Sequence, residues 1–121
     1  MPKKVLIIDD ELDLLKFVAF RLEKSGYKVL VALDSQEAFT LMKRVIPDLI
    51  LLDMRLPGLN GYEICRKIKI DETLKNIPII LFTASILCDT PENVRQAGAD
   101  DCIIKPFEAK ELLNKVKRFI G

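Results

Sequence analysis

The chain has 121 residues, of which half are apolar and 31% are charged, a balance typical of one globular domain and unlike that of a disordered segment. Nineteen basic and eighteen acidic residues leave a net charge of +1, so overall charge gives no reason to expect binding to nucleic acid or to an anionic membrane. The absence of histidine excludes histidine-dependent catalysis and histidine metal ligands. We expect a single domain over residues 1–121.

Three cysteines, Cys65, Cys88 and Cys102, are widely spaced and form no C-x-x-C pair. We therefore expect reduced packing residues in a cytoplasmic protein, and neither a disulfide framework nor a zinc site. No apolar run has the length of a membrane span, and the N-terminal sequence lacks the apolar core and cleavage site of a signal peptide.

Short runs rich in Val, Ile and Leu alternate with longer amphipathic segments along the chain. The runs predict strands at residues 4–9, 28–32, 48–53, 77–83 and 102–105. The segments between and after them predict helices near residues 11–24, 35–45, 61–70, 91–97 and 109–120. Strict alternation of strand and helix with short connections predicts an α/β fold, with one parallel five-stranded sheet and helices on both faces.

Residues with known preferences for helix ends agree with these boundaries. Asp34 or Ser35 can cap the second helix, and Thr90-Pro91 can begin the fourth. Ser25-Gly26 and Gly98 follow the first and fourth helices, where a left-handed residue is often required.

Polar residues stand at the ends of four predicted strands, where a sheet of this kind forms its binding site. They are Asp9 with Asp10, Asp53, Thr83 and Lys105. Two carboxylates roughly 5 Å apart repel by about 3 kcal/mol at an effective dielectric of about 20, so either a cation binds or one carboxylate is protonated. We expect Mg²⁺, which takes carboxylate oxygens together with water and phosphate oxygens.

The same charges predict phosphoryl chemistry. A phosphoryl group at this edge would meet a metal ion and the ammonium of Lys105, and phosphoryl transfer asks the protein mainly for positioning and charge stabilisation. A carboxylate can itself be the acceptor and form an aspartyl phosphate.

Four stretches resemble the receiver domain of bacterial two-component response regulators of the chemotaxis-regulator type. In order and across the whole chain they are IIDDE, LILLDMRLPGLNGYEICRKI, IPIILFTA and GADDCIIKPF. The resemblance implies a flavodoxin-like three-layer sandwich with strand order 2-1-3-4-5. It also implies a signalling switch and no turnover enzyme. The phosphoryl donor would be a phosphohistidine on a sensor histidine kinase or a histidine phosphotransfer protein. A downstream effector protein or domain would read the change, without contact of this domain with nucleic acid or membrane.

The resemblance assigns roles around the acceptor. It makes Asp53 the phosphoacceptor and makes Asp9, Asp10 and Asp53 ligands of Mg²⁺, with Mn²⁺ as an alternative ion. The backbone carbonyl of Arg55 would be a further ligand. Arg55 and Ser85 would set the lifetime of the acyl phosphate.

The resemblance also implies a switch. Thr83, Ala84, Lys105 and Pro106 would bind the phosphoryl group, and the Thr83 hydroxyl would couple it to movement of the loop and helix after the fourth strand. Lys105-Pro106 matches a cis peptide of the family. Cys102 stands where the family usually has an aromatic residue, so we predict a response confined to that loop and helix.

The resemblance also implies a docking surface for the phosphodonor. In the family, the first helix and the loop after the fifth strand receive the phosphodonor, which implies contacts from Leu14, Phe17, Pro106 and Phe107, with core packing as the alternative. Ile86 and Leu87 are apolar in a loop that is commonly polar, which indicates a partner surface or, alternatively, residues folded over the sheet edge.

Other interpretations of these residues remain open. Asp10 could cap the first helix, and Asp100-Asp101 have the pattern of solvated turn residues. The chain could be a phosphohydrolase with an aspartyl-phosphate intermediate, although that class places a second acid where Arg55 stands here. It could also be a receiver-like interaction module without functional phosphorylation.

Overall fold

The computed structural model describes residues 2–54, 61–83, 95–96 and 98–121. Within these ranges the strands are β1 (Lys4–Ile8), β2 (Lys28–Ala32), β3 (Leu49–Asp53), β4 (Ile79–Thr83) and β5 (Asp101–Ile104). The helices are α1 (Leu12–Lys24), α2 (Ser35–Met42), α3 (Gly61–Ile70) and α5 (Ala109–Ile120). All described strands pair in parallel in the order β2-β1-β3-β4-β5, which confirms the predicted fold.

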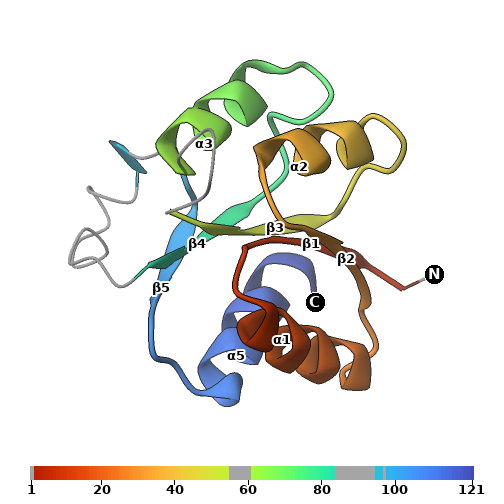
Figure 1. The fold of residues 1–121 in the computed structure, drawn as a ribbon, viewed down its shortest axis with the longest axis vertical. Helices are drawn as coiled ribbons and strands as arrows, with labels where there is room; N and C mark the ends of the chain where they lie inside the picture. The colour runs from red at the N-terminus through yellow and green to blue at the C-terminus, as the bar shows by residue number, and fades with distance from the viewer. Residues whose placement is uncertain (1, 55–60, 84–94, 97) are drawn as a thin grey trace.

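The sheet separates two apolar layers. Helices α2 and α3 cover one face and α1 and α5 the other (Figure 1). Alternate residues of one strand face opposite layers, so that Leu6 and Ile8 of β1 pack towards α2 and α3 while Val5 and Ile7 pack towards α1 and α5. All four are fully buried, which explains why the central strands are continuously apolar in sequence.

Helix α2 and strand β4 are shorter than predicted by more than one residue, for identifiable reasons. Helix α2 ends at Met42 and not near residue 45, because the chain tightens at Arg44, whose amide donates to the carbonyl of Leu41, before Pro47. Strand β4 begins at Ile79, because Ile77 belongs to the preceding turn, where its amide donates to the carbonyl of Leu74.

The helix ends follow the sequence pattern closely. The Asp34 carboxylate accepts a hydrogen bond from the amide of Glu37 and caps α2. Gly26 and Gly98 have positive φ angles of 95° and 85°, the conformation that glycine supplies after a helix. The N-cap position of α1 is occupied by Glu11, whose side chain makes no capping bond, so the interpretation of Asp10 as the cap is wrong. The fourth predicted helix lies largely outside the described residues.

The cysteines differ from one another. Cys65 is a free, buried thiol, as expected. Cys102 is also buried but is disulfide-bonded to a partner outside the described residues, so the expectation of reduced cysteines throughout is wrong. No described helix combines the length and apolar character required to cross a bilayer.

Candidate functional site

Three carboxylates meet where β1 and β3 end. Asp9 follows β1 and is fully buried, and its amide donates to the carbonyl of Ala32 at 3.1 Å, which holds it beside the end of β2. Asp53 is the last residue of β3 and is also buried. One carboxylate oxygen from each of Asp9, Asp10 and Asp53 lies within 4.8 Å of the others. The structure therefore brings together the acidic residues that the sequence places at separate strand ends.

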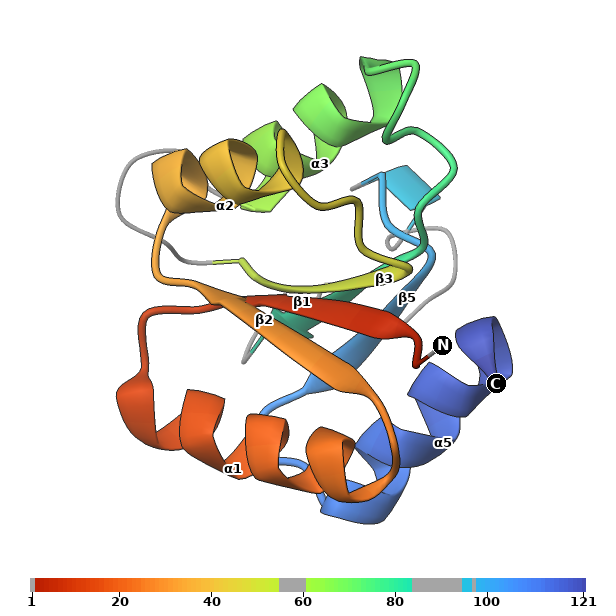
Figure 2. The ribbon, with the colours of Figure 1, turned by 90° about the vertical axis from the view of Figure 1, so that its right-hand side faces the viewer.

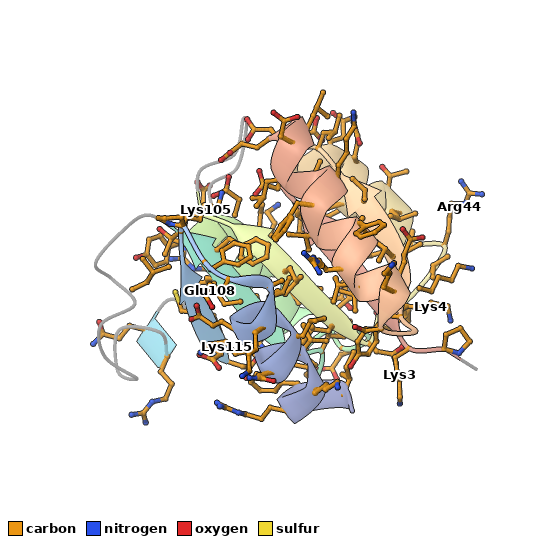
Figure 3. The ribbon with its side chains drawn as sticks, turned by 90° about the horizontal axis from the view of Figure 1, so that it is seen from below. Lys3, Lys4, Arg44, Lys105, Glu108 and Lys115 are labelled. Atoms are coloured by element: carbon orange, nitrogen blue, oxygen red, sulfur yellow. The ribbon has the colours of Figure 1, made fainter. Side chains whose placement is uncertain are left out.

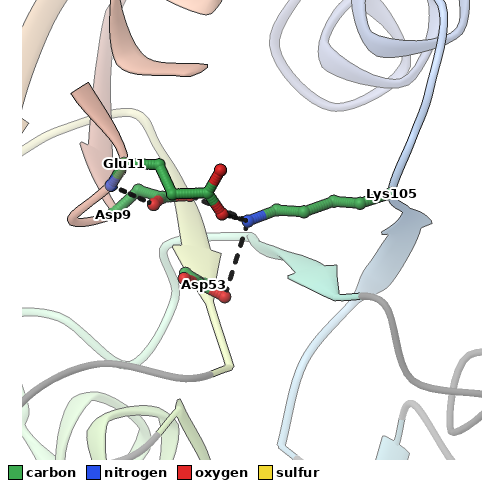
Figure 4. Close-up of polar contacts among 4 residues, drawn as sticks. All are labelled: Asp9, Glu11, Asp53 and Lys105. Carbon is green, nitrogen blue, oxygen red and sulfur yellow. Dashed lines mark hydrogen bonds and ion pairs between the residues drawn. The ribbon is translucent and has the colours of Figure 1, made fainter. Parts of the chain in front are cut away.

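Lys105 reaches this group from the end of β5. Its backbone amide donates to the carbonyl of Thr83 at 2.8 Å. Its ammonium nitrogen lies 3.2 Å from Asp9 Oδ2 and 3.7 Å from Asp53 Oδ1 (Figure 4). In Figure 3 the same lysine lies across the molecule from Lys3 and Lys4, at the edge of the sheet where the strands end.

The ionisation of Lys105 follows from this environment. Burial alone lowers the pKa of its ammonium group, but the hydrogen bond to Glu11 and the negative charges of Asp53 and Asp9 outweigh burial and raise the pKa above its usual value. The lysine therefore stays charged at neutral pH, as electrostatic stabilisation of a phosphoryl group requires.

Glu11 is a site residue that the sequence analysis did not assign. Its Oε1 atom lies 3.1 Å from the Lys105 ammonium nitrogen, and its amide donates to Asp9 Oδ1 at 2.9 Å (Figure 4). The sequence feature that could have indicated this role is the position of Glu11 directly after Asp9 and Asp10, at the same end of β1. Lys105 thus has a further carboxylate partner, on a largely exposed side chain.

The ends of β3 and β4 are held in fixed register. Asp53 pairs with Phe82, and the amide of Met54 donates to the Phe82 carbonyl at 3.1 Å. Thr83, the next residue of β4, is buried one position beyond. Arg55, Ala84 and Ser85, to which the resemblance assigns metal, phosphoryl and lifetime roles, lie outside the described residues.

Gly61 returns the chain to this end of β3. Its amide donates to the carbonyl of Met54 at 3.0 Å. A Cβ atom built on Gly61 would lie 2.8 Å from Met54 Cα and 3.2 Å from the Asp53 carbonyl oxygen. Only glycine permits this close approach of two backbones beside the Asp53 carboxylate.

Beside the acidic group lies a pocket of about 500 Å³. Its lining residues are Glu11, Leu14, Phe17, Lys105, Pro106 and Phe107. Phe107 stacks on Phe82 with ring centroids 5.2 Å apart, so it serves the core as well as the pocket. Lys105-Pro106 is a cis peptide, as the resemblance implies. Ile86 and Leu87 lie outside the described residues.

Asp100 and Asp101 at the other end of β5 are more than solvated turn residues. Asp101 Oδ1 lies 2.9 Å from the Lys115 ammonium, with both side chains about one-fifth exposed. Asp100 Oδ2 accepts a hydrogen bond from the amide of Ile79 at 2.8 Å and forms an ion pair with Lys69 at 3.2 Å. The expectation of solvation is wrong for Asp101, and Asp100 also has a structural role.

The donor set of the site fits a hard divalent cation. All three side chains offer oxygen, two of them are buried, and Asp10 is exposed at the mouth, where further ligands from solvent or a phosphoryl group can approach. The positive charge of Lys105 does not neutralise the three carboxylates of the site. A divalent cation therefore fits the site electrostatically as well as geometrically.

Comparisons with known proteins agree with this geometry. The model of the response regulator receiver domain matches residues 5–117. The phosphate regulon transcriptional regulatory protein of Pseudomonas aeruginosa is 43% identical over 115 residues, which cover 95% of this chain and 50% of that protein. The DNA-binding response regulator MtrA of Mycobacterium tuberculosis is 37% identical over 119 residues, which cover 97% of this chain and 50% of that protein. The chain thus spans about half the length of these relatives.

Solved structures show the same fold. The chemotaxis response regulator CheY4 of Vibrio cholerae superposes with a TM-score of 0.90 at 28% identity, covering 99% of this chain and all of that one. The receiver domain of the sensor histidine kinase PA1611 of Pseudomonas aeruginosa has a TM-score of 0.88 at 35% identity, covering 100% of this chain and 99% of that one. Its structure has a magnesium ion coordinated in the active-site cleft. The chain described here belongs to the family of response regulator receiver domains.

Proposed function

We propose that Asp53 accepts a phosphoryl group from a phosphohistidine in a reaction that requires Mg²⁺, and that the phosphorylated state controls binding of a partner. The observation that carries this proposal is the meeting of Asp9, Asp10 and Asp53 within 4.8 Å, with the Lys105 ammonium beside them. As a receiver domain of two-component signalling, the chain is a signalling switch and not a turnover enzyme.

In the proposed transfer, an oxygen of the Asp53 carboxylate attacks phosphorus, and the bond between phosphorus and the donor's imidazole nitrogen breaks with its electron pair remaining on the ring. Asp9, Asp10, Asp53 and the carbonyl of Arg55 would hold the metal ion. Bound Mg²⁺ would stabilise negative charge on the phosphoryl oxygens.

Lys105 has to change partners during this reaction. In the structure its ammonium nitrogen contacts carboxylates of Asp9 and Glu11, and the Glu11 contact is with an exposed side chain that water can replace at little cost. We propose that Lys105 exchanges the Glu11 carboxylate for a phosphoryl oxygen, so that one charged pair replaces another and the ammonium is never left unpaired.

The switch itself would start at the end of β4. We propose that the Thr83 hydroxyl and the amide of Ala84 bind the phosphoryl group and that the loop and helix after β4 move in response. The hydrogen bond between the Lys105 amide and the Thr83 carbonyl supports this coupling, because it joins the two strand ends that would face the group. Arg55 and Ser85 would tune the lifetime of the aspartyl phosphate.

The pocket next to Lys105 supports a docking site for the phosphodonor. We propose that the donor protein contacts Leu14 and Phe17 on α1 and Phe107 just before α5, which form an apolar wall next to the ammonium. The partner would be a histidine kinase or a histidine phosphotransfer protein in the cytoplasm. Ile86 and Leu87 would contribute to a second surface for the effector.

We further propose that residues 1–121 act as one receiver domain, whose output passes to an effector domain or protein. The support is that curated relatives about twice as long are named as transcriptional or DNA-binding regulators. Mn²⁺ would substitute for Mg²⁺, since it too prefers oxygen ligands.

The decisive experiment measures the intact mass of the protein after incubation with acetyl phosphate, with Mg²⁺ and with EDTA. We expect the mass of one phosphoryl group on the wild type with Mg²⁺ only, and none on the Asp53→Asn variant. Asp101→Asn serves as a matched control, because it makes the same chemical change at the opposite end of the sheet and should leave phosphorylation intact. Phosphorylation of the Asp53→Asn variant to the wild-type extent would show that another residue is the acceptor.

A further inference from the structure

Strand β2 lies at the open edge of the described sheet. It pairs with β1 on one side, and Figure 2 looks onto its other side, where α1 and α2 flank it and no described strand covers it. The amide of Lys28 and the carbonyl of Ala32 bond towards β1. Because direction alternates along a strand, the amide and carbonyl groups of Val29 and Val31 point away from β1 and are available for another strand.

The open side of β2 is apolar. Val31 is 42% exposed and shares one face of the strand with Val29, and Leu33, in the bend directly after the strand, is 37% exposed. On α1, Leu12 is also exposed, and helical spacing places it on the flank opposite the Leu14 and Phe17 row, of which Phe17 faces Phe107. A groove of about 460 Å³ runs between β2 and α2, in which Val31 and Leu41 lie among polar and charged residues of α2 and its flanks.

The charges at the two ends of this segment are complementary and symmetric. Lys28 precedes Val31 by three residues and Asp34 follows it by three. Lys28 is exposed, and Asp34 is half-buried and caps α2 through Oδ1. A segment with opposite charges at equal distances from its centre matches an antiparallel copy of itself.

We propose that β2 pairs with β2 of a second copy of this chain, antiparallel and centred on Val31, so that two sheets join into one across a twofold axis. In this register Val31 lies opposite its own copy and exchanges backbone hydrogen bonds with it. Val29 lies opposite the partner's Leu33, and Lys28 lies opposite the partner's Asp34. Apolar pairs then cover one face of the junction and two ion pairs close its ends.

The register is specific. Centring on Leu30 would also align the outward backbone groups, but it would place Lys28 opposite Ala32 and leave Asp34 without a cation across the junction. Centring on Val31 aligns the apolar and charged groups together, and it requires the Leu33 amide to exchange its hydrogen bond to Glu37 Oε1 for one to the partner's Val29 carbonyl. A parallel arrangement would place like charges opposite one another, which is unfavourable.

The first test is a substitution on each edge of the sheet. Val31→Lys puts two ammonium groups opposite each other at the axis, so in sedimentation equilibrium without phosphodonor the dimer should dissociate at least about tenfold more readily than wild type. Ile104→Lys makes the same change at an exposed position of the other edge strand, β5, and should leave association unchanged. A wild-type monomer at millimolar concentration, or dissociation by Ile104→Lys alone, would overturn the proposal.

The second test exchanges the charges. Lys28→Asp and Asp34→Lys should each weaken the dimer, and the double variant should restore it, as should an equimolar mixture of the two single variants. The comparison of Asp34→Lys with the double variant is internally controlled, because both lack the α2 cap. Failure of the double variant to recover association, with both proteins folded by circular dichroism, would refute this register and with it the proposed pairing.

Discussion

Asp9 shows how one buried carboxylate can serve both the fold and the site. One oxygen accepts the Glu11 amide and shapes the turn into α1, while the other contacts the Lys105 ammonium. Removing one partner of a buried ion pair leaves an uncompensated charge, which is far more costly than loss of an exposed pair. Asp9 and Lys105 are therefore mutually dependent, whereas Glu11 at the rim can exchange its partner freely.

The close approach of Gly61 to the backbone of Met54 and Asp53 can be tested by substitution. Gly61→Ala should destabilise the fold by about 1–3 kcal/mol, because the new methyl group would overlap Met54 Cα, and it should weaken Mg²⁺ binding by displacing Asp53. Urea denaturation and a Mg²⁺ titration followed by NMR measure the two effects.

Gly26→Ala provides the comparison. Gly26 has a positive φ angle but open space around its Cα, so alanine there should cost about 1 kcal/mol of backbone strain and leave Mg²⁺ affinity unchanged. Equal Mg²⁺ affinity in both variants would show that the close approach of Gly61 does not position Asp53.

The residues that sequence reasoning placed correctly share one property: a strand end fixes where they lie. Asp9, Asp53 and Lys105 each follow an apolar run, so topology alone brings them together. Glu11 and Asp101 were not assigned their contacts, because these depend on partners 94 and 14 residues away that no local pattern specifies. The disulfide of Cys102 was missed for the same reason.

At the scale of elements, α5 is tied to the sheet at two levels. Leu112 and Val116 bury its apolar side, and Lys115 forms an ion pair with Asp101 at the start of β5. Arg118 approaches the same carboxylate at 3.5 Å. Helix α5 is thus fixed against β5 by both packing and charge.

We predict that Asp101→Asn lowers the unfolding free energy by about 1–3 kcal/mol, because it leaves the largely buried Lys115 ammonium without its charged partner. Glu72→Gln is the matched control: its pair with Lys75 is exposed, and the change should cost less than about 0.5 kcal/mol. Urea denaturation of both variants checks this, and equal losses would contradict the structural role of Asp101.

Element boundaries were predictable where a cap or glycine marks them. Helix α3 at Gly61–Ile70 and α5 at Ala109–Ile120 match the expected ranges. The errors at α2 and β4 arise before Pro47 and at Pro78. At α2 the chain tightens where the Arg44 amide donates to the Leu41 carbonyl, and at β4 Pro78 has no amide hydrogen to donate. Apolar periodicity reports burial, and burial extends beyond regular structure at both places.

At the scale of the whole molecule, the sheet divides the interior into two apolar layers and has charged residues at both ends of its strands. The carboxylates of Asp9, Asp10 and Asp53 gather where the strands end, whereas Lys4 and Lys28 lie where strands begin, at the same end as the pair of Asp101 and Lys115. A partner that approaches the described part of the site therefore meets clustered carboxylates with the ammonium of Lys105 among them.

The buried thiol of Cys65 makes the stability of the whole fold depend on pH. Burial raises the pKa of its thiol to about 12, with Lys69 opposing and Asp100 reinforcing the shift. An unfolded thiol releases its proton near about pH 8.5, so folding stability should fall as pH rises above that value. Iodoacetamide at about pH 8 should modify Cys65 only in molecules that have opened, as peptide mass mapping would show. Rapid labelling under native conditions would mean that α3 leaves the sheet without global unfolding.

The alkylation rate of the buried Cys65 thiol therefore measures how often the folded molecule opens. Comparing that rate with and without magnesium or a phosphate would show how far each of them delays opening, with no dye or tag attached.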